Sequence, residues 1–85
     1  MPYFTYVIRS ESSNKIYIGQ TDNLEFRLRR HNGKYPTKKG SFTKINKGPW
    51  NLIHQEMFET RHEAIIKEKQ LKSHAGRDWI RKLLK

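Results

Sequence analysis

The chain has 85 residues, the size of one small domain, and it carries 18 lysine and arginine residues against 8 acidic residues, a formal net charge of +10. It has no cysteine, which excludes disulfides and thiolate metal sites. No signal-peptide pattern and no long apolar run is visible, so we expect a cytoplasmic protein without a membrane-spanning segment. The charge predicts a polyanionic partner, nucleic acid in preference to a membrane surface, although a merely solvated surface is the plainer interpretation.

Two strands joined by a turn are expected at the start of the chain. Residues 3–9 and residues 15–19 are rich in aromatic and β-branched side chains, and residues 10–14 have turn chemistry. An antiparallel hairpin with a four-residue connection would place Tyr6 opposite Tyr17, on the same face of the sheet. The pair is either an ordinary aromatic contact of the core or part of a functional site.

A first helix is predicted over residues 23–31. Asp22 and Glu25 have the spacing of a capping box, which marks its start. Asn32 and Gly33 end it, because both residues tolerate the left-handed conformation.

Residues 32–49 differ in composition from the rest of the chain, since they contain lysine, glycine and proline but no acidic residue. This composition predicts a long, mobile, cationic loop, and loops of this length are usually functional. Together with Arg30 of the preceding helix, its lysines are the candidate contacts to nucleic-acid phosphates. They are Lys34, Lys38, Lys39, Lys44 and Lys47.

The second half of the chain predicts one strand followed by two helices. Residues 50–59 read as the third strand, and Thr60 with Glu63 forms a second capping box that opens a helix to about residue 73. Gly76 is expected to break this helix. The last helix, residues 77–84, would place its apolar side chains on one face, namely Trp79, Ile80, Leu83 and Leu84.

The expected architecture is therefore a single α+β domain over residues 1–85. Its elements follow the order β-β-α-β-α-α, as a small three-stranded antiparallel sheet flanked by helices.

Three polar side chains lie on or beside the predicted apolar faces of the helices. Arg27 and His31 are four residues apart and share one side of the first helix, where a surface arginine and a helix-terminal histidine are the plain interpretations. Glu68 falls in the middle of the apolar stripe of the second helix, where a carboxylate is costly unless it is paired or binds a cation. An ion pair with Lys72 and a metal-ligand role are equally consistent with its position.

Several short motifs occur in a fixed order along residues 3–73. They are Phe4-Thr5-Tyr6, Tyr17-Ile18-Gly19, Arg27-Leu28, His31-Asn32, Gly48-Pro49-Trp50, Glu63-Ala64 and the run from Lys67 to Lys72. This ordered set resembles the GIY-YIG nuclease family, above all its short stand-alone bacterial members, which are related to the N-terminal nuclease domain of the bacterial excision-repair system. The family fold, a small antiparallel sheet with flanking helices, agrees with the elements predicted above.

The resemblance implies a role for each polar residue singled out above. Tyr6 would act as or assist the general base, Tyr17 would hold the attacking water or a phosphate oxygen, and Arg27 would stabilise the pentacoordinate phosphorus. His31 would position or deprotonate water. Glu68 would be the one protein ligand of a divalent metal ion, Mg²⁺ or Mn²⁺, which often binds few carboxylates. A phenol with a pKa near 10 is ~0.1% ionised at pH 7, so Arg27, the metal or Lys15 would have to lower that value or receive the proton's charge in the transition state.

The function implied is a metal-dependent endonuclease that acts on DNA in repair or recombination. The alternatives are a non-catalytic or weakly active nucleic-acid-binding module of the same fold and a basic RNA-associated protein. Two departures from the family pattern matter: Phe4 replaces the first glycine, so the backbone there lacks the freedom of glycine, and residues 69–85 contain no asparagine, so the role of that residue is dispensable or the activity is weak. In a chain this short we expect target selection to come from DNA shape, from a protein partner, or not at all.

Overall fold

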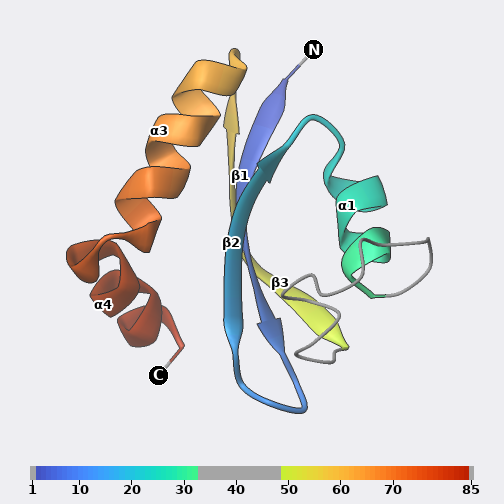
Figure 1. The fold of residues 1–85 in the computed structure, drawn as a ribbon, viewed down its shortest axis with the longest axis vertical. Coiled ribbons are helices and arrows are strands. Elements are labelled where there is room, and N and C mark those ends of the chain that lie inside the picture. The colour runs from blue at the N-terminus through green and yellow to red at the C-terminus, as the bar shows by residue number, and fades with distance from the viewer. Residues whose placement is uncertain (1, 33–48, 85) are drawn as a thin grey trace.

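The computed structural model describes residues 2–32 and 49–84. Its strands are β1 (Tyr3–Ser10), β2 (Ile16–Thr21) and β3 (Trp50–Phe58), and its helices are α1 (Leu24–His31), α3 (Arg61–Lys72) and α4 (His74–Leu83). The antiparallel sheet has the order β2-β1-β3, so the first strand of the sequence lies in the middle (Figure 1). The predicted α+β class and element order are confirmed. The five lysines of the predicted cationic loop lie outside the described residues.

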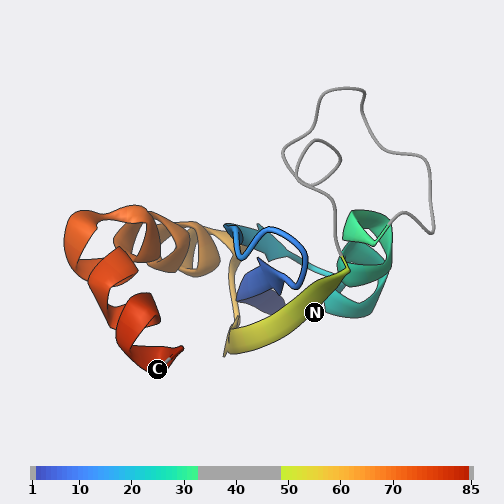
Figure 2. The same cartoon turned by 90° about the horizontal axis from the view of Figure 1, so that it is seen from below.

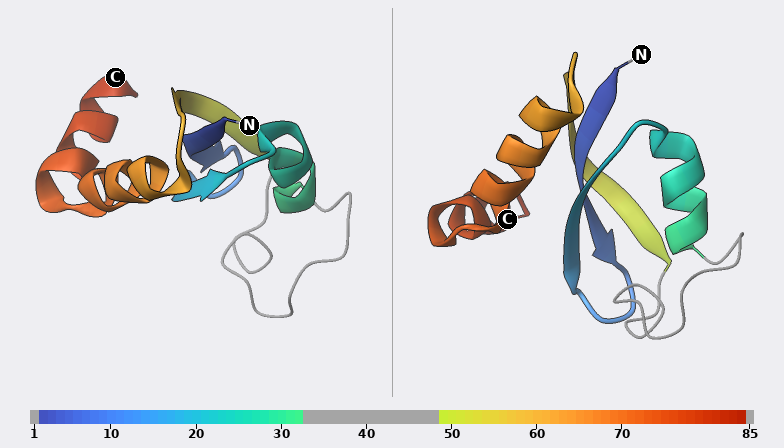
Figure 3. Two further views of the ribbon diagram at one scale, coloured as in Figure 1. Left: turned by 90° about the horizontal axis from the view of Figure 1, so that it is seen from above. Right: turned by 45° about the horizontal axis from the view of Figure 1, so that its top comes forward.

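The helices cover both faces of the sheet, with α3 and α4 on one face and α1 on the other (Figures 2 and 3). Two apolar clusters result from the alternation of side chains along the strands. The cluster under α3 and α4 consists of Val7, Ile18, Leu71 and Ile80. The cluster on the α1 face consists of Tyr6, Ile8 and Trp50, with Leu24 and Leu28 of α1 packed against it.

The predicted register of the β1–β2 hairpin is wrong by two residues. Tyr6 pairs with Gly19, and Tyr17 pairs with Ile8. The connection has the expected four residues but begins one residue later in the chain: the Ser10 amide donates to the Lys15 carbonyl at 2.9 Å, and Asn14 within the turn adopts a left-handed conformation, with φ 61°. A shift of two residues preserves the face of each side chain, so both tyrosines still lie on the α1 side.

The helix termini confirm one capping prediction and correct three others. Thr60 caps α3 by accepting from the Glu63 amide, as predicted, whereas the cap of α1 is Asn23 and not Asp22. Asn32 ends α1 with φ −86°, outside the left-handed region. Gly76 does not break a helix: Ser73 ends α3 and caps α4, and Gly76 lies in the first turn of α4.

Only part of the predicted apolar face of α4 is buried. Ile80 is buried and Leu84 packs against the same cluster, whereas Trp79 and Leu83, one turn apart, are exposed. All four positions fall on one broad side of a regular helix, as predicted, and the part with Trp79 and Leu83 lies away from the core. Within the described part of the chain, the helices are too short and too polar to cross a membrane.

Candidate active site

The candidate site is built around Tyr6, which stands in the middle of the central strand. Its side chain has 0% exposed surface. Its hydroxyl lies 2.7 Å from Nε2 of His31 and accepts a hydrogen bond at 3.3 Å from Nε of Arg27. Arg27 and His31 reach it from the same side of α1, as their spacing of four residues predicts. Three residues singled out from the sequence are thus in direct contact.

Gly19 provides the space for the Tyr6 phenol. The two residues pair across the β1–β2 ladder, and a Cβ atom on Gly19 would lie 2.7 Å from the Tyr6 hydroxyl oxygen and 3.0 Å from Cε1 of Tyr17. No side chain fits there without displacing a phenol. The glycine of the Tyr17-Ile18-Gly19 motif therefore serves packing rather than backbone freedom.

Tyr17 completes an aromatic group on the α1 face of the sheet. Its ring centroid is 4.7 Å from that of His31 and 6.2 Å from that of Tyr6. Arg27 forms a side-chain hydrogen bond with Tyr17 as well as with Tyr6. One guanidinium therefore contacts both phenols, and Tyr17 is the half-buried one of the two.

Burial controls the protonation of this group. It raises the pKa of Tyr6 above its ordinary value, and the hydrogen bond from Arg27 only partly offsets that effect. Burial also lowers the pKa of His31 to about 4, helped by the positive charges of Arg27 and Arg30. Tyr6 is therefore protonated and His31 neutral at pH 7. Arg27 lowers the pKa of Tyr6, as expected, but in the protein alone desolvation by burial outweighs this effect, so the net shift is upward.

Glu68 approaches from the opposite side of the sheet. It lies on α3, which packs against β1 and β2, and its side chain is 20% exposed. Its negative charge contributes to the raised pKa of Tyr6, which places the carboxylate within electrostatic reach of the Tyr6 phenol. Lys72 contacts Glu68 Oε2 at 2.6 Å, so the ion pair considered from the sequence is present.

The donor set for a cation is small. Among residues 2–32 and 49–84, no group of three or more histidine, cysteine, aspartate or glutamate side chains is arranged to hold a metal ion. A single carboxylate nevertheless fits a hard cation of the Mg²⁺ type, which commonly takes one or two carboxylates and completes its shell with water and phosphate.

Asn32 has a structural role that its sequence position did not reveal. Its side-chain amide donates to the Trp50 carbonyl at 3.1 Å, and its side-chain oxygen accepts from the Trp50 amide at 2.6 Å. This reciprocal pair fastens the end of α1, and with it His31, to the start of β3. The His31-Asn32 motif drew attention to the residue but did not indicate this contact, because its partner is 18 residues away.

The remaining arginines of α1 have different surroundings. Arg29 is exposed and pairs with Glu25 at 2.6 Å, as expected of a solvated charge. Arg30 is half-buried and close enough to His31 for its charge to act there.

Comparison with known proteins agrees with this geometry. The family model of the GIY-YIG catalytic domain matches residues 2–82. UPF0213 proteins of Staphylococcus aureus, from strains Mu3 and Mu50 among others, are 29% identical over 79 residues, covering 93% of this chain and 90% of theirs. The solution NMR structure of a UPF0213 protein from Bacillus halodurans superposes with a TM-score of 0.54 at 21% identity, covering 98% of this chain and 85% of that one.

GIY-YIG catalytic domains are nuclease domains, so the match gives this chain a nuclease-type function in general and nucleic acid as its general substrate class. The family model spans nearly the whole described structure, including Tyr6, Tyr17, Arg27, His31 and Glu68. The chain therefore belongs to the GIY-YIG family of nuclease domains.

Proposed function

We propose that the protein is a metal-dependent endonuclease that hydrolyses DNA phosphodiester bonds in repair or recombination, and that residues 1–85 work as a single domain. The observation that carries the proposal is the Tyr6 hydroxyl, buried between Arg27 and His31 at hydrogen-bonding distance from both. A structural core does not require an arginine and a histidine on one buried phenol. A site that must hold positive charge in a fixed place for catalysis does require such an arrangement.

The two tyrosines divide the work according to their exposure. Tyr17 is half-buried, so it is the phenol that meets the attacking water and the phosphate. Tyr6 assists indirectly, because its hydroxyl fixes the orientation of Arg27 and His31. In the reaction, the water oxygen bonds to phosphorus as the bond to the leaving oxygen breaks. The proton of the water passes through the Tyr17 hydroxyl to solvent, and the leaving oxygen takes up a proton from solvent.

Arg27 is the residue that stabilises the transition state. It is permanently charged, and its hydrogen bonds to both phenols hold its guanidinium in one place. The negative charge that develops on the phosphate oxygens then meets a donor already in position. His31, which is neutral at pH 7, adds no positive charge of its own.

Glu68 would hold the divalent metal ion, Mg²⁺ or Mn²⁺. Once bound, such an ion supplies positive charge to the phosphate and makes a coordinated water more acidic. Lys72 would then have to leave Glu68 Oε2, which an exposed ammonium on the next helical turn does at little cost.

The test is an endonuclease assay on duplex, flap and junction DNA, with Mg²⁺, with Mn²⁺ and with chelator, for the wild type and for Glu68→Gln. We expect metal-dependent cleavage by the wild type. Glu68→Gln should abolish it while DNA binding and the thermal unfolding temperature are retained. Cleavage by Glu68→Gln at the wild-type rate would show that Glu68 holds no metal and would remove the centre of the proposal.

The second candidate is a weakly active or non-catalytic nucleic-acid-binding module. The contact of Lys72 with Glu68 at 2.6 Å favours it, because an occupied carboxylate is less available to a cation. The variant Lys72→Gln separates the two functions. An endonuclease should cut at least as well without the competing lysine, whereas a binding module should remain inactive on every substrate tested. RNA in place of DNA is a further arm of the same assay.

A further inference from the structure

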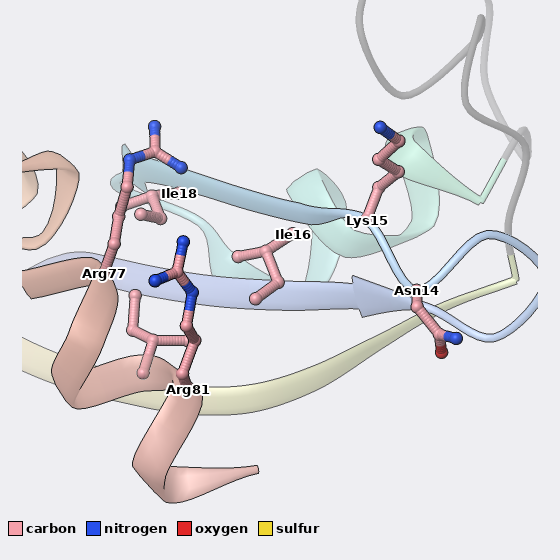
Figure 4. Close-up of a pocket in the computed structure, with 7 residues that line it drawn as sticks. Asn14, Lys15, Ile16, Ile18, Arg77 and Arg81 are labelled. Carbon is pink, nitrogen blue, oxygen red and sulfur yellow. The ribbon is translucent and has the colours of Figure 1, made fainter. Parts of the chain in front are cut away.

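A basic hollow lies between the start of β2 and α4, on the face of the sheet opposite α1. Its volume is about 380 Å³. Figure 4 shows the arginines of α4 reaching across it toward β2, with Lys15 and Asn14 at its other end. The residues that line it are Asn14, Lys15, Ile16, Ile18, Arg77, Ile80 and Arg81.

The hollow combines an aliphatic floor with a cationic rim. Ile18 and Ile80 are almost fully buried, whereas the charged side chains around them are exposed. Lys15, Arg77 and Arg81 are three cations, and no carboxylate is among the lining residues. Asp78 lies nearby and contacts Arg81 at 3.1 Å, which leaves the rim with an excess of positive charge.

Hydrogen bonds hold parts of the rim in place. Nε of Arg77 donates to the Lys72 carbonyl at 3.1 Å, so the arginine is fastened at the base of its guanidinium. Asn14 accepts from Arg9 at 2.7 Å and stands in the left-handed turn of the hairpin. A rim fastened at both ends offers donors whose positions are set before a ligand arrives.

β2 connects the hollow to the candidate active site. It is an edge strand, and its side chains alternate between the two faces. Ile16 and Ile18 form part of the floor of the hollow, while Tyr17 between them faces Arg27 and His31. One strand of nucleic acid that follows the β2 edge can therefore reach both places.

We propose that the hollow binds the backbone of the nucleic-acid substrate at a phosphodiester near the scissile one. Guanidinium groups match phosphate oxygens in geometry and charge, and Lys15 adds a third cation. The aliphatic floor accepts the apolar side of a sugar. The inference rests on the proposed function, because it assigns the second contact to the same strand that the candidate active site cuts.

The experiment measures DNA binding without cleavage. Labelled duplex DNA is titrated in chelator at several salt concentrations with the wild type, with Arg77→Gln/Arg81→Gln and with a control of equal charge loss, Lys69→Gln/Lys82→Gln. The control lysines are exposed on α3 and α4 and do not line the hollow. Arg77→Gln/Arg81→Gln should flatten the slope of log affinity against log salt by about 0.9 for each phosphate that the hollow no longer neutralises. The control should leave the slope nearly unchanged.

A charge-conserving variant and a free-phosphate arm complete the test. Arg77→Lys/Arg81→Lys should restore the wild-type slope, which excludes a folding defect as the cause. Equal slopes for the two glutamine variants would overturn the proposal, since only total charge would then matter. Inorganic phosphate should shift the methyl resonances of Ile16, Ile18 and Ile80 only at far higher concentration than DNA does. Saturation by phosphate at the same concentration as DNA would also overturn it, by assigning the hollow to a free anion.

The two proposals fail in different ways. A wild type that never cuts DNA, with a slope that still depends on Arg77 and Arg81, would refute the nuclease and leave the hollow as a backbone site. A wild type that cuts, with hollow variants that bind and cut like it, would refute the hollow alone.

Discussion

Gly19 of the Tyr17-Ile18-Gly19 motif is required by the packing of the Tyr6 side chain. The missing side chain lets the Tyr6 ring lie against β2, and any Cβ would come within 2.7 Å of the hydroxyl that Arg27 and His31 contact. The substitution of Phe4 for the glycine of the first motif has no such cost, because β1 forms a regular ladder there with Thr21 and Met57.

We predict that Gly19→Ala displaces the Tyr6 phenol. The close approach should lower the free energy of unfolding by about 1–3 kcal/mol, the usual range for overpacking a buried site. Cleavage should fall further than the reduced stability explains, because Arg27 and His31 would no longer share a common partner. Urea denaturation and the cleavage assay measure the two effects. If Gly19→Ala is as stable and as active as the wild type, the phenol is not confined in the way described.

The role of Arg27 is tested against its neighbour on the same helix. Arg27→Ala should reduce turnover by about 10²–10³, the effect of losing a principal donor to a transition-state anion. Arg29→Ala removes the same charge from an exposed side chain paired with Glu25 and should affect binding only modestly. Single-turnover rates at saturating protein separate the two effects. Equal losses for both variants would argue for a generic basic surface.

His31 should make stability depend on pH. Its pKa is about 4 in the folded protein, below the ordinary 6.5, because it is buried beside Arg27 and Arg30. As the pH falls below about 6.5, the unfolded chain takes up a proton before the folded one does, so stability is lost between that pH and about 4.

We predict that between about pH 6.5 and 5 the wild type loses about 1 kcal/mol or more relative to His31→Gln, measured by urea denaturation. Glu56 does not interfere in this window. Burial raises the pKa of its carboxyl, but contacts with His54 and Lys67 outweigh burial and lower it, so its contribution disappears at more acidic pH. Parallel pH curves for the two proteins would show that His31 is solvated.

The junction of α3 and α4 shows how two helices share one residue. The Ser73 hydroxyl donates to the Gln70 carbonyl at 2.5 Å and accepts from the Gly76 amide at 3.2 Å, so it ends one helix and starts the next. A Cβ on Gly76 would lie 2.5 Å from the Leu71 Cα atom. Gly76 therefore allows a close approach of backbones, with no need of its conformational freedom.

Gly76→Ala should cost more stability than Ser73→Ala. The alanine methyl would meet backbone atoms that cannot move aside, at about 2 kcal/mol or more, whereas losing the cap costs about 1 kcal/mol. Both values come from urea denaturation, and circular dichroism checks that the helices remain. The reverse order would indicate that α4 shifts freely relative to α3.

The elements themselves could be predicted from local sequence, because alternation, capping residues and the 3.6-residue period are local signals. The three strands and the starts and ends of α1 and α3 follow from them to within a few residues. Register and the α3–α4 break could not be predicted. The register depends on the left-handed conformation of Asn14, and the break depends on the close approach of Gly76 to Leu71. Both are set by tertiary structure.

The same division holds for the candidate site. The spacing of Arg27 and His31 placed them on one side of α1, and the position of Glu68 on its stripe marked it as unusual. The direction of the Tyr6 pKa shift could not be predicted from sequence, since it depends on how deeply the phenol is buried. The link between Asn32 and Trp50 joins residues 18 positions apart and has no local signal either.

At the scale of the whole molecule, the net charge of +10 should appear as a salt-dependent affinity for nucleic acid. We predict that Lys38→Gln/Lys39→Gln/Lys44→Gln flattens the slope of log affinity against log salt by roughly two to three units, if each lysine neutralises one phosphate. The reduction in affinity should be the same for all DNA sequences, because phosphate contacts carry no base information. Fluorescence anisotropy measures both, and an unchanged slope would direct attention to Arg30 and α4.

The two hydrogen bonds between the Asn32 side chain and the Trp50 backbone hold positions 32 and 50 together, whatever residues lie between them in the sequence. Closing a chain segment whose ends are already held costs entropy that rises only with the logarithm of its length, about 0.6 kcal/mol for each doubling. A change in the length of the segment between them therefore costs little closure entropy. The fold offers evolution, and the protein engineer, a position where new substrate preferences can be inserted beside the candidate active site.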